Sequence, residues 1–384
     1  MNPNFALDQE QLRIRDEVSL FAQEHLNHKV AARSRESFFD PALWRRCGEE
    51  YLQGVAVSTA YVGQGYSALN PALALEGLGY GCEDGGLAFA LAAHILSCTI
   101  PVSLYGSDAQ KENYLPGMAS GLMIATNAMT ETQGGSAASQ MHSHAEQVGS
   151  GFVLTGEKSF CANAPVSDLC LTYVLSDRDK GFFGGVSAFL LDRKQHNYVV
   201  SENIEKLGLR TCQTGSVTFD RLEASSDDMV GELGGGGVIF NKSMDWERVG
   251  ISAMNVGTMA RILENAVRYA KARKPGGTAI SRHQAISHTL ANIATEIEAC
   301  RLLVYNAASQ LESGGSTSRT AAMAKLFVSE CFKTTTMSLM QLYSAEGFMA
   351  DSEIGRVLQD STASTMYSGT SEIQRNIIAA WMRC

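Results

Sequence analysis

The run "GFVLTGEKSF" at residues 151–160 decides the fold class, because it interrupts a chain that otherwise has helical spacing. It is short, rich in β-branched and aromatic residues, and bounded by glycine, as strands commonly are. Three later runs share these properties: "LCLTYVL" (169–175), "VSAFLLD" (186–192) and "GSVTFDRLEA" (215–224). Together they predict a small antiparallel β domain at residues 124–233, inserted between helical parts.

Helical patterns flank this β domain on both sides. From Phe5 onward, apolar residues recur at helical intervals, and the run "LAFALAAHILSCTIPVSLYG" (87–106) predicts a buried helix that ends at Pro101. After the glycines 234–237, an apolar face extends along one long helix from Met244 to Ala270. We therefore predict an α+β, mainly α fold. Its parts are an N-terminal α-helical domain (1–123), a middle β domain (124–233) and a C-terminal four-helix bundle (234–384).

Composition limits the classes of function. The chain has 384 residues, of which 45% are hydrophobic and 18% charged, so a large core is expected. Its formal net charge of -9 argues against a nucleic-acid partner. The acidic, amphipathic N-terminus has no apolar signal core, and no run approaches 18 uninterrupted apolar residues. We expect a cytoplasmic protein with no membrane segment.

Metal and phosphate sites are weakly supported. The nine cysteines form no C-x-x-C pair, so free buried thiols are expected rather than disulfides or zinc ligands. His142 and His144 could present two ligands on one strand face, but no third ligand lies nearby in sequence, and we expect no metal. The glycines 234–237 lack a G-K-[ST] ending, so a β-to-α junction is favoured over a phosphate cradle.

Six stretches, in order along the chain, resemble the acyl-CoA dehydrogenase family of flavoproteins. They are "HILSCTIPVSLYGSDAQKENYLPGMASG" (94–121), "AMTETQGGSA" (128–137), "TGEKSFCANAP" (155–165), "RKPGGTAISRHQ" (273–284), "QLYSAEGF" (341–348) and "MYSGTSEIQR" (366–375). None is specific alone, but the ordered set spans nearly the whole chain. The resemblance implies this family's fold, FAD as cofactor and an acyl thioester as substrate.

By this resemblance, twelve residues would bind FAD: Met129, Thr130, Gly135, Ser136, Phe160, Ala162, Arg273, Gln284, Gln341, Ala345, Thr370 and Glu372. Phe160 stands where the family stacks an aromatic ring on the flavin. Ala162 stands where the family usually has a threonine whose hydroxyl reaches flavin N5, so that hydrogen bond is missing here. Without the resemblance, a polar turn better explains the "TETQGGS" run (130–136), and a core aromatic at a strand end better explains Phe160. A solvated helix end is the alternative for Arg273 and Gln284.

The segments near Arg273 depart from the family pattern. Pro275 and Gly276 interrupt the usual aromatic position, and Ser344 with Ala345 replace a Gly-Gly pair. The resemblance therefore implies a reshaped pocket at the adenine end of FAD. It also implies a homotetramer, in which the Arg273 segment completes the FAD site of a neighbouring subunit.

The catalytic base is displaced in this sequence. Removing the α proton of an acyl thioester needs a desolvated carboxylate, which the family usually supplies from Y-E-G-T, but Ser368 occupies that place. A minority of the family carries the base on the helix after the β domain, directly before an arginine, as Glu247 and Arg248 stand here. Ile251 and Met254 share a helix face with Glu247, so its side chain is expected on the buried stripe.

Two other interpretations of Glu247 remain open from the sequence. It could be a solvent-facing partner of Arg248, or an acid favoured in a first helical turn by the helix dipole. Asp245, Arg248, Ser136, Ser368 and Gly369 match positions where the family binds substrate.

The sequences of three stretches are similar to those of a family subgroup that acts on prolyl groups tethered to carrier proteins. They are the W-E pair with "SAMNVGTMARILE" (252–264), the S-G-T run, and "EDGGLAFALAAH" (83–94). The resemblance implies an aminoacyl carrier protein, in natural-product biosynthesis, as partner, and an electron-transfer flavoprotein or oxygen as electron acceptor. A branched-chain acyl-CoA dehydrogenase of isovaleryl type, and a non-catalytic binding protein with the family fold, are the alternatives.

Overall fold

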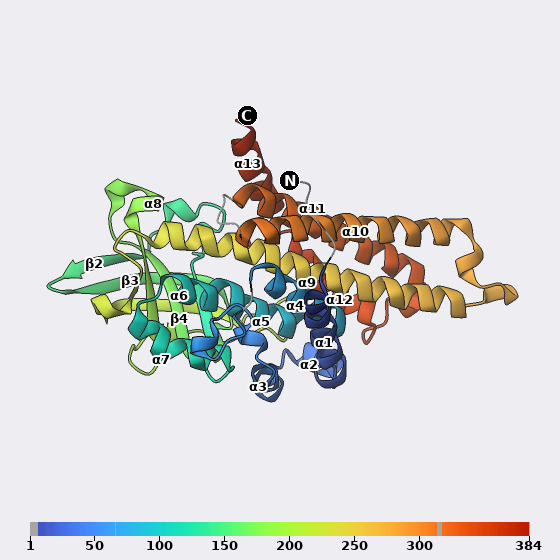
Figure 1. Ribbon diagram of the computed structural model, residues 1–384, viewed down its shortest axis with the longest axis horizontal. Helices are drawn as coiled ribbons and strands as arrows, with labels where there is room; N and C mark the ends of the chain where they lie inside the picture. Colours follow the sequence, from blue (N-terminus) through green and yellow to red (C-terminus); the bar gives the residue numbers. More distant parts are fainter. Residues whose placement is uncertain (1–6, 66, 313–316, 384) are drawn as a thin grey trace.

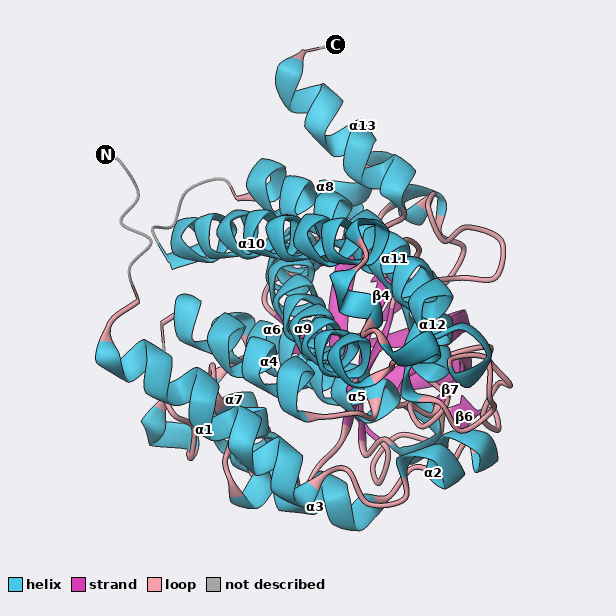
Figure 2. Cartoon of the chain, turned by 90° about the vertical axis from the view of Figure 1, so that its right-hand side faces the viewer, coloured by secondary structure: helices cyan, strands magenta, loops and turns pink. Residues whose placement is uncertain are grey.

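Two groups of helices enclose a β-sheet in the computed structural model, which describes residues 7–65, 67–312 and 317–383. The predicted helical start at Phe5, and Cys384, lie outside the described residues. In Figure 1 the sheet lies at one end of the molecule, and the long C-terminal helices run from it to the opposite end. Figure 2 shows that the last helix projects away from the rest of the chain.

The N-terminal part is helical, as predicted. Its helices are α1 (Gln9–His25), α2 (Val30–Glu36), α3 (Pro41–Glu49), α4 (Leu69–Gly81), α5 (Gly85–His94), α6 (Ile100–Tyr105) and α7 (Asp108–Ala119). Helix α1 begins at Asp8 because the Asp8 carboxylate accepts the backbone N–H of Gln11 at 2.8 Å, while the Gln11 side chain accepts the N–H of Asp8.

The prediction that Pro101 ends the buried helix was wrong. A π-helical turn, Ile95–Thr99, joins α5 to α6, and Pro101 is the second residue of α6. Proline is tolerated in a first turn, and the wider π turn accommodates its missing N–H. The stretch Gly85–Tyr105 is long and apolar enough to cross a membrane, but 78% of its apolar window is buried inside the protein.

The middle part forms an eight-stranded sheet. Its strands are β1 (Ala125–Ala128), β2 (His144–Val148), β3 (Gly151–Ala162), β4 (Leu169–Leu175), β5 (Val186–Asp192), β6 (Val199–Val200), β7 (Thr214–Ala224) and β8 (Met229–Val230). The order is β6-β7-β3-β2-β4-β5-β8, with β1 beside β4. The sheet is mainly antiparallel, but β1 and β2 each pair with β4 in parallel, which the strand patterns did not predict. A short helix, α8 (Phe182–Gly185), precedes β5.

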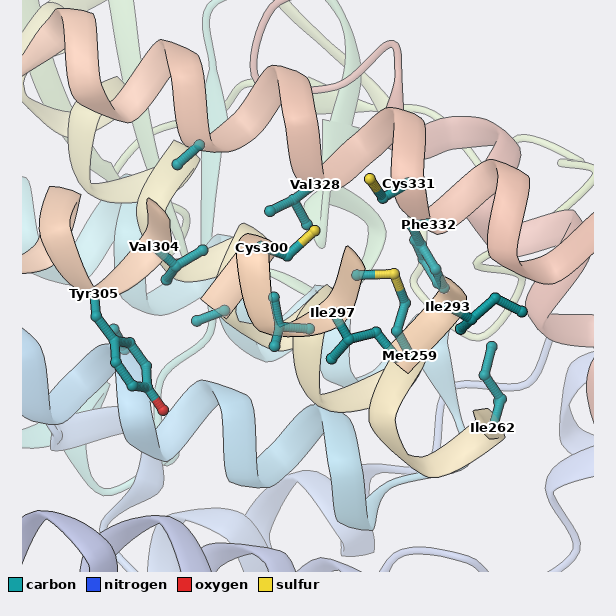
Figure 3. Packing of buried hydrophobic residues seen from close by; sticks show 14 of the residues in the cluster. Met259, Ile262, Ile293, Ile297, Cys300, Val304, Tyr305, Val328, Cys331 and Phe332 are labelled. Atoms are coloured by element: carbon teal, nitrogen blue, oxygen red, sulfur yellow. The ribbon is translucent and has the colours of Figure 1, made fainter. Parts of the chain in front are cut away.

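The C-terminal helices are α9 (Gly236–Ala272), α10 (Gln284–Glu312), α11 (Ser318–Tyr343), α12 (Glu353–Ser364) and α13 (Ser371–Met382). Glycines 234–237 form the predicted β-to-α junction. Figure 3 shows apolar side chains of α9, α10 and α11 meeting in one core, with Met259, Ile297 and Val328 among them. Helix α9 also packs closely on α4, because at Gly257 a Cβ atom would lie 2.0 Å from the Glu76 carbonyl oxygen.

No cysteine in the described residues forms a disulfide: the eight are free and buried. Over the same residues, no group of three or more His, Cys, Asp or Glu side chains is arranged to hold a metal ion.

Candidate active site

Glu247 lies on the buried face of α9, about three turns from its start. The residue is only 9% exposed, and Ile251 and Met254 on the same face are 1% and 4% exposed. The predicted buried stripe is therefore confirmed. The interpretation of Glu247 as a solvent-facing partner of Arg248 was wrong, because Arg248 pairs instead with Asp245.

Two serine hydroxyls donate hydrogen bonds to the Glu247 carboxylate, one to each oxygen. Ser368 Oγ donates to Oε1 at 2.5 Å, and Ser97 Oγ donates to Oε2. The serine that replaces the usual base therefore contacts the candidate base directly. Ser97 lies on the π-helical turn between α5 and α6 and was not singled out from the sequence. It stands 150 residues from Glu247, and no local pattern marks it.

Three side chains hold the backbone of the turn that carries Ser368. Lys325 Nζ donates to the Gly369 carbonyl at 2.8 Å, and Gln374 donates to the carbonyls of Ser368 and Gly369 at 3.0 and 2.8 Å. Arg248 Nε donates to the Ser368 carbonyl at 3.4 Å. Ser368 itself has a left-handed φ of 55°, a conformation that non-glycine residues rarely adopt. The turn is thus fixed in a strained conformation by its surroundings.

Lys325, on α11, was also missed by the sequence analysis. Its only signal is a lysine inside the apolar run "AAMAKLF" (321–327). Burial, followed by the nearby positive charge of Arg248, lowers the pKa of Lys325 to about 8. Its ammonium group also lies 5.8 Å from the centre of the Tyr367 ring.

Asp245 and Arg248 are both buried and form an ion pair at 3.2 Å. The second carboxylate oxygen of Asp245 accepts the hydroxyls of Thr317 and Ser318, each at 2.9 Å. Burial lowers the pKa of Arg248, although the negative charge of Asp245 opposes that shift. These contacts tie α9 to the start of α11, and the substrate-binding role of both residues stays a prediction.

The predicted flavin-ring residues lie where strands β1 and β3 end. Ser159 N–H donates to the Thr130 carbonyl at 2.7 Å, which joins the segment of Met129 and Thr130 to β3. Phe160, next on β3, is 63% exposed and has a left-handed φ of 57°. An aromatic side chain held outward in this way suits a planar ring that covers it.

Ala162, at the end of β3, packs against the same core cluster as Ile251, Met254 and Tyr367. It thus connects the predicted flavin face to the neighbourhood of Glu247. The residues fit the predicted cofactor, since Phe160 offers an exposed aromatic face at the end of β3, beside the segment of Met129 and Thr130.

A buried ion pair supports this flavin face. Lys158 Nζ lies 2.9 Å from Glu131 Oε1 and also donates to the Met129 carbonyl. The N–H groups of His142 and Ser143 donate to the same carboxylate. Burial acts to raise the pKa of Glu131, but these N–H donors and Lys158 outweigh it and lower the pKa to about 2. Glu131 lies in the motif at 128–137 and Lys158 in the motif at 155–165, and neither motif alone predicts that they pair.

Gly135 and Ser136 lie in the exposed loop that follows Glu131. A cavity of about 170 Å³ opens beside this loop, and Met129, Glu131 and Gly134 are among the residues that line it. Thr370 caps α13, since its hydroxyl accepts the Ile373 N–H at 3.3 Å, while Glu372 is exposed in the first turn of that helix.

The remaining predicted FAD residues lie far from Glu247. Arg273 follows the end of α9, 26 positions (273 − 247) after Glu247, which at 1.5 Å per residue is ~39 Å along the helix. Arg273 pairs with Glu346 at 3.6 Å, which places it beside Ala345. Gln284 and Gln341 are likewise exposed. Within one chain the structure therefore forms two groups of predicted FAD residues, at separate places.

Comparison with known proteins agrees with this fold. The acyl-CoA dehydrogenase N-terminal, middle and C-terminal domains match residues 8–122, 126–222 and 234–383. An L-prolyl-[peptidyl-carrier protein] dehydrogenase from Pseudomonas fluorescens is 36% identical over 89% of this chain and 90% of the relative. The chain belongs to the acyl-CoA dehydrogenase family and is an FAD-dependent acyl-thioester dehydrogenase.

Two solved structures are particularly similar to this chain. The prolyl acyl carrier protein oxidase AnaB has a TM-score of 0.96 and 35% identity, covering 99% of this chain and 100% of AnaB. PigA with FAD and proline has a TM-score of 0.96 and 33% identity, covering 99% of both chains.

The ion pair between Glu131 and Lys158 gives a pH-dependent prediction. The depressed pKa of Glu131 means that its stabilising contribution is full above the unfolded pKa near ~4.3 and is lost as the pH falls toward about 2. Glu131→Gln should lower the free energy of unfolding by roughly 3 kcal/mol at pH 7, because it leaves Lys158 buried without its anion. This difference from the unmodified chain should shrink by pH 3, as measured by denaturant unfolding.

Glu157→Gln is the matched control, since Glu157 is an exposed acid next to Lys158 on β3. It should leave the unfolding free energy nearly unchanged at both pH values. Equal stability of Glu131→Gln and the unmodified chain at pH 7 would refute the role of the pair.

Proposed function

We propose that this enzyme desaturates a prolyl group tethered to a carrier protein, with Glu247 as the base that removes the α proton. The observation that carries the proposal is the buried Glu247 carboxylate, held by the hydroxyl of the serine that stands in the usual base position. The prolyl carrier-protein dehydrogenase and oxidase names of the similar proteins support the substrate class.

The chemistry assigned to the chain follows from these contacts. The α C–H bond of a thioester is a weak acid, so its proton passes to a carboxylate that is desolvated and close. Glu247 meets the first requirement, and its position on the long α9 helix holds it still. Phe160 would hold the FAD cofactor, which would supply the acceptor for the β hydride. Ser368 and Gly369 are proposed to contact the thioester from the turn held by Lys325.

The surroundings of Glu247 favour a compact acyl group. The Tyr367 ring lies 4.9 Å from the Phe89 ring, and its hydroxyl accepts a hydrogen bond from Asn255 at 3.0 Å. Asn255 stands two helical turns beyond Glu247 on the same side of α9. We propose that these bulky side chains limit the room for a long acyl chain, whereas a five-membered ring requires less.

Two other functions are compatible with the family fold. A branched-chain acyl-CoA dehydrogenase of isovaleryl type would share the base position, and nothing in the position of Glu247 separates the two substrates. A non-catalytic binding protein is disfavoured, because it has no use for an ionisable carboxylate buried on an apolar face.

We further propose that FAD is held between subunits. The ~39 Å along α9 between Glu247 and Arg273 exceeds what one FAD molecule can span. Arg273 and Gln284 of one subunit would then complete the site of its neighbour, in the predicted homotetramer. Arg273→Ala should lower the FAD content of the purified protein several-fold without changing its folding. A monomeric protein that retains one FAD per chain would contradict this arrangement, as sedimentation and absorbance measurements would show.

Glu247→Gln tests the base. The variant should bind FAD as the unmodified chain does, because Glu247 is not among the residues predicted to hold the cofactor. Under anaerobic conditions, prolyl-carrier protein should reduce the flavin of this variant at least ~10³-fold more slowly than that of the unmodified chain. Stopped-flow absorbance measures both rates. An unchanged rate of bleaching would end the proposal that Glu247 is the base.

A comparison of two substrates tests the acyl group and its carrier. Prolyl-carrier protein and isovaleryl-CoA are offered separately to the anaerobic holoenzyme, and flavin bleaching is followed. We expect bleaching by the prolyl-carrier protein, since the similar proteins are a prolyl-carrier-protein dehydrogenase and a prolyl acyl carrier protein oxidase. Bleaching by isovaleryl-CoA alone would instead assign the enzyme to branched-chain acyl-CoA substrates. A protein that takes up no FAD would favour the binding-protein alternative.

A further inference from the structure

Ser97 is a buried serine whose hydroxyl is committed to a carboxylate rather than to backbone. It is 2% exposed, and its Oγ donates to Glu247 Oε2. Most buried helix hydroxyls bond a backbone carbonyl about one turn back, as Thr99 does with His94 at 3.0 Å. Ser97 differs from this pattern, because its hydroxyl donates to the Glu247 carboxylate on another helix.

The local backbone explains why Ser97 reaches α9. Pro101 has no N–H, so it cannot donate to the Ser97 carbonyl four residues earlier. The chain responds with a π-helical turn in which the Ile100 N–H bonds to the Ile95 carbonyl, five residues back. This turn packs against α9 and presents Ser97 to Glu247. Pro101, which was predicted to end the helix, is thus part of the local structure that positions Ser97.

We propose that Ser97 is a positioning residue for the base, acting together with Ser368 as a clamp of two hydroxyls on Glu247. This inference rests on the proposed role of Glu247. Ser97 holds Oε2 from α5–α6, and Ser368 holds Oε1 from the turn before α13. With one donor on each oxygen, the plane of the carboxylate is fixed, and its remaining lone pairs are left to accept the α proton.

The clamp also replaces hydrogen bonds to water that the Glu247 carboxylate loses on burial. Hydrogen bonds donated to a carboxylate favour its charged form, whereas burial favours the neutral form. The charged and titratable groups near Glu247 come from several elements: Arg248, which is paired with Asp245, on α9, Lys325 on α11, Cys98 beside Ser97, Tyr173 on β4, and Tyr367. Only the two serines donate hydrogen bonds to its carboxylate among the described residues.

The test is the rate of flavin reduction in Ser97→Ala, measured by anaerobic stopped flow with prolyl-carrier protein from pH 5 to 9. Losing one hydrogen bond to a charged group should slow reduction roughly 10- to 100-fold at pH 7. The acidic limb of the rate profile should move to higher pH, because the ionised base loses a donor. Ser368→Ala should show the same shift.

Thr99→Val is the matched control, because it removes a buried hydroxyl from the same π turn that bonds only backbone. It should leave the profile unmoved, so that loss of turn structure is separated from loss of the donor. A profile of Ser97→Ala identical in rate and pH dependence to that of the unmodified enzyme would overturn the proposal, provided that Glu247→Gln is inactive. If Glu247→Gln is active, the assignment of the base fails instead.

Discussion

The candidate active site depends on one constraint, which is that the carboxylate of Glu247 is kept in the interior. Removing Glu247 from water costs several kcal/mol unless hydrogen bonds replace the lost hydration. Two serines provide these bonds, and they come from the π turn near residue 97 and from the turn at residue 368. Three parts of the chain that are remote in sequence are therefore tied to one side chain. The precision of the site follows from this convergence.

The serines themselves are held by a second set of contacts. Lys325 and Gln374 fix the carbonyls of the turn at residue 368, while Asp245 and Arg248 join α9 to the start of α11. These groups are buried, and a half-satisfied polar network in such a place would be costly. Positive charges on Arg248 and Lys325 surround the acidic ones on Asp245 and Glu247, so the cluster is close to electrically balanced.

The fold was largely predictable from sequence, because it depends on patterns that repeat within each element. Strand-like runs located the sheet, and helix spacing placed Glu247 on the buried face of α9. The parallel pairing of β1 with β4 was not predictable, since it depends on register between distant segments. The contact of Ser97 was not predictable for the same reason, because its partner Glu247 is 150 residues away. In addition, Pro101 nearby predicted a helix end.

Electrostatic repulsion explains why residues 247 and 368 do not both carry a carboxylate. Ser368 Oγ lies 2.5 Å from the Glu247 carboxylate. A glutamate at residue 368, where the family usually has one, would bring a second carboxylate against the first, and two such charges cannot both stay ionised at that separation. With the Glu247 carboxylate at this place, a hydroxyl donor on the turn is favourable where a second carboxylate would be repelled. Ser368 supplies this donor, with its φ of 55° held by neighbouring side chains. The same argument applies to Ser97, whose hydroxyl donates to the opposite oxygen of Glu247.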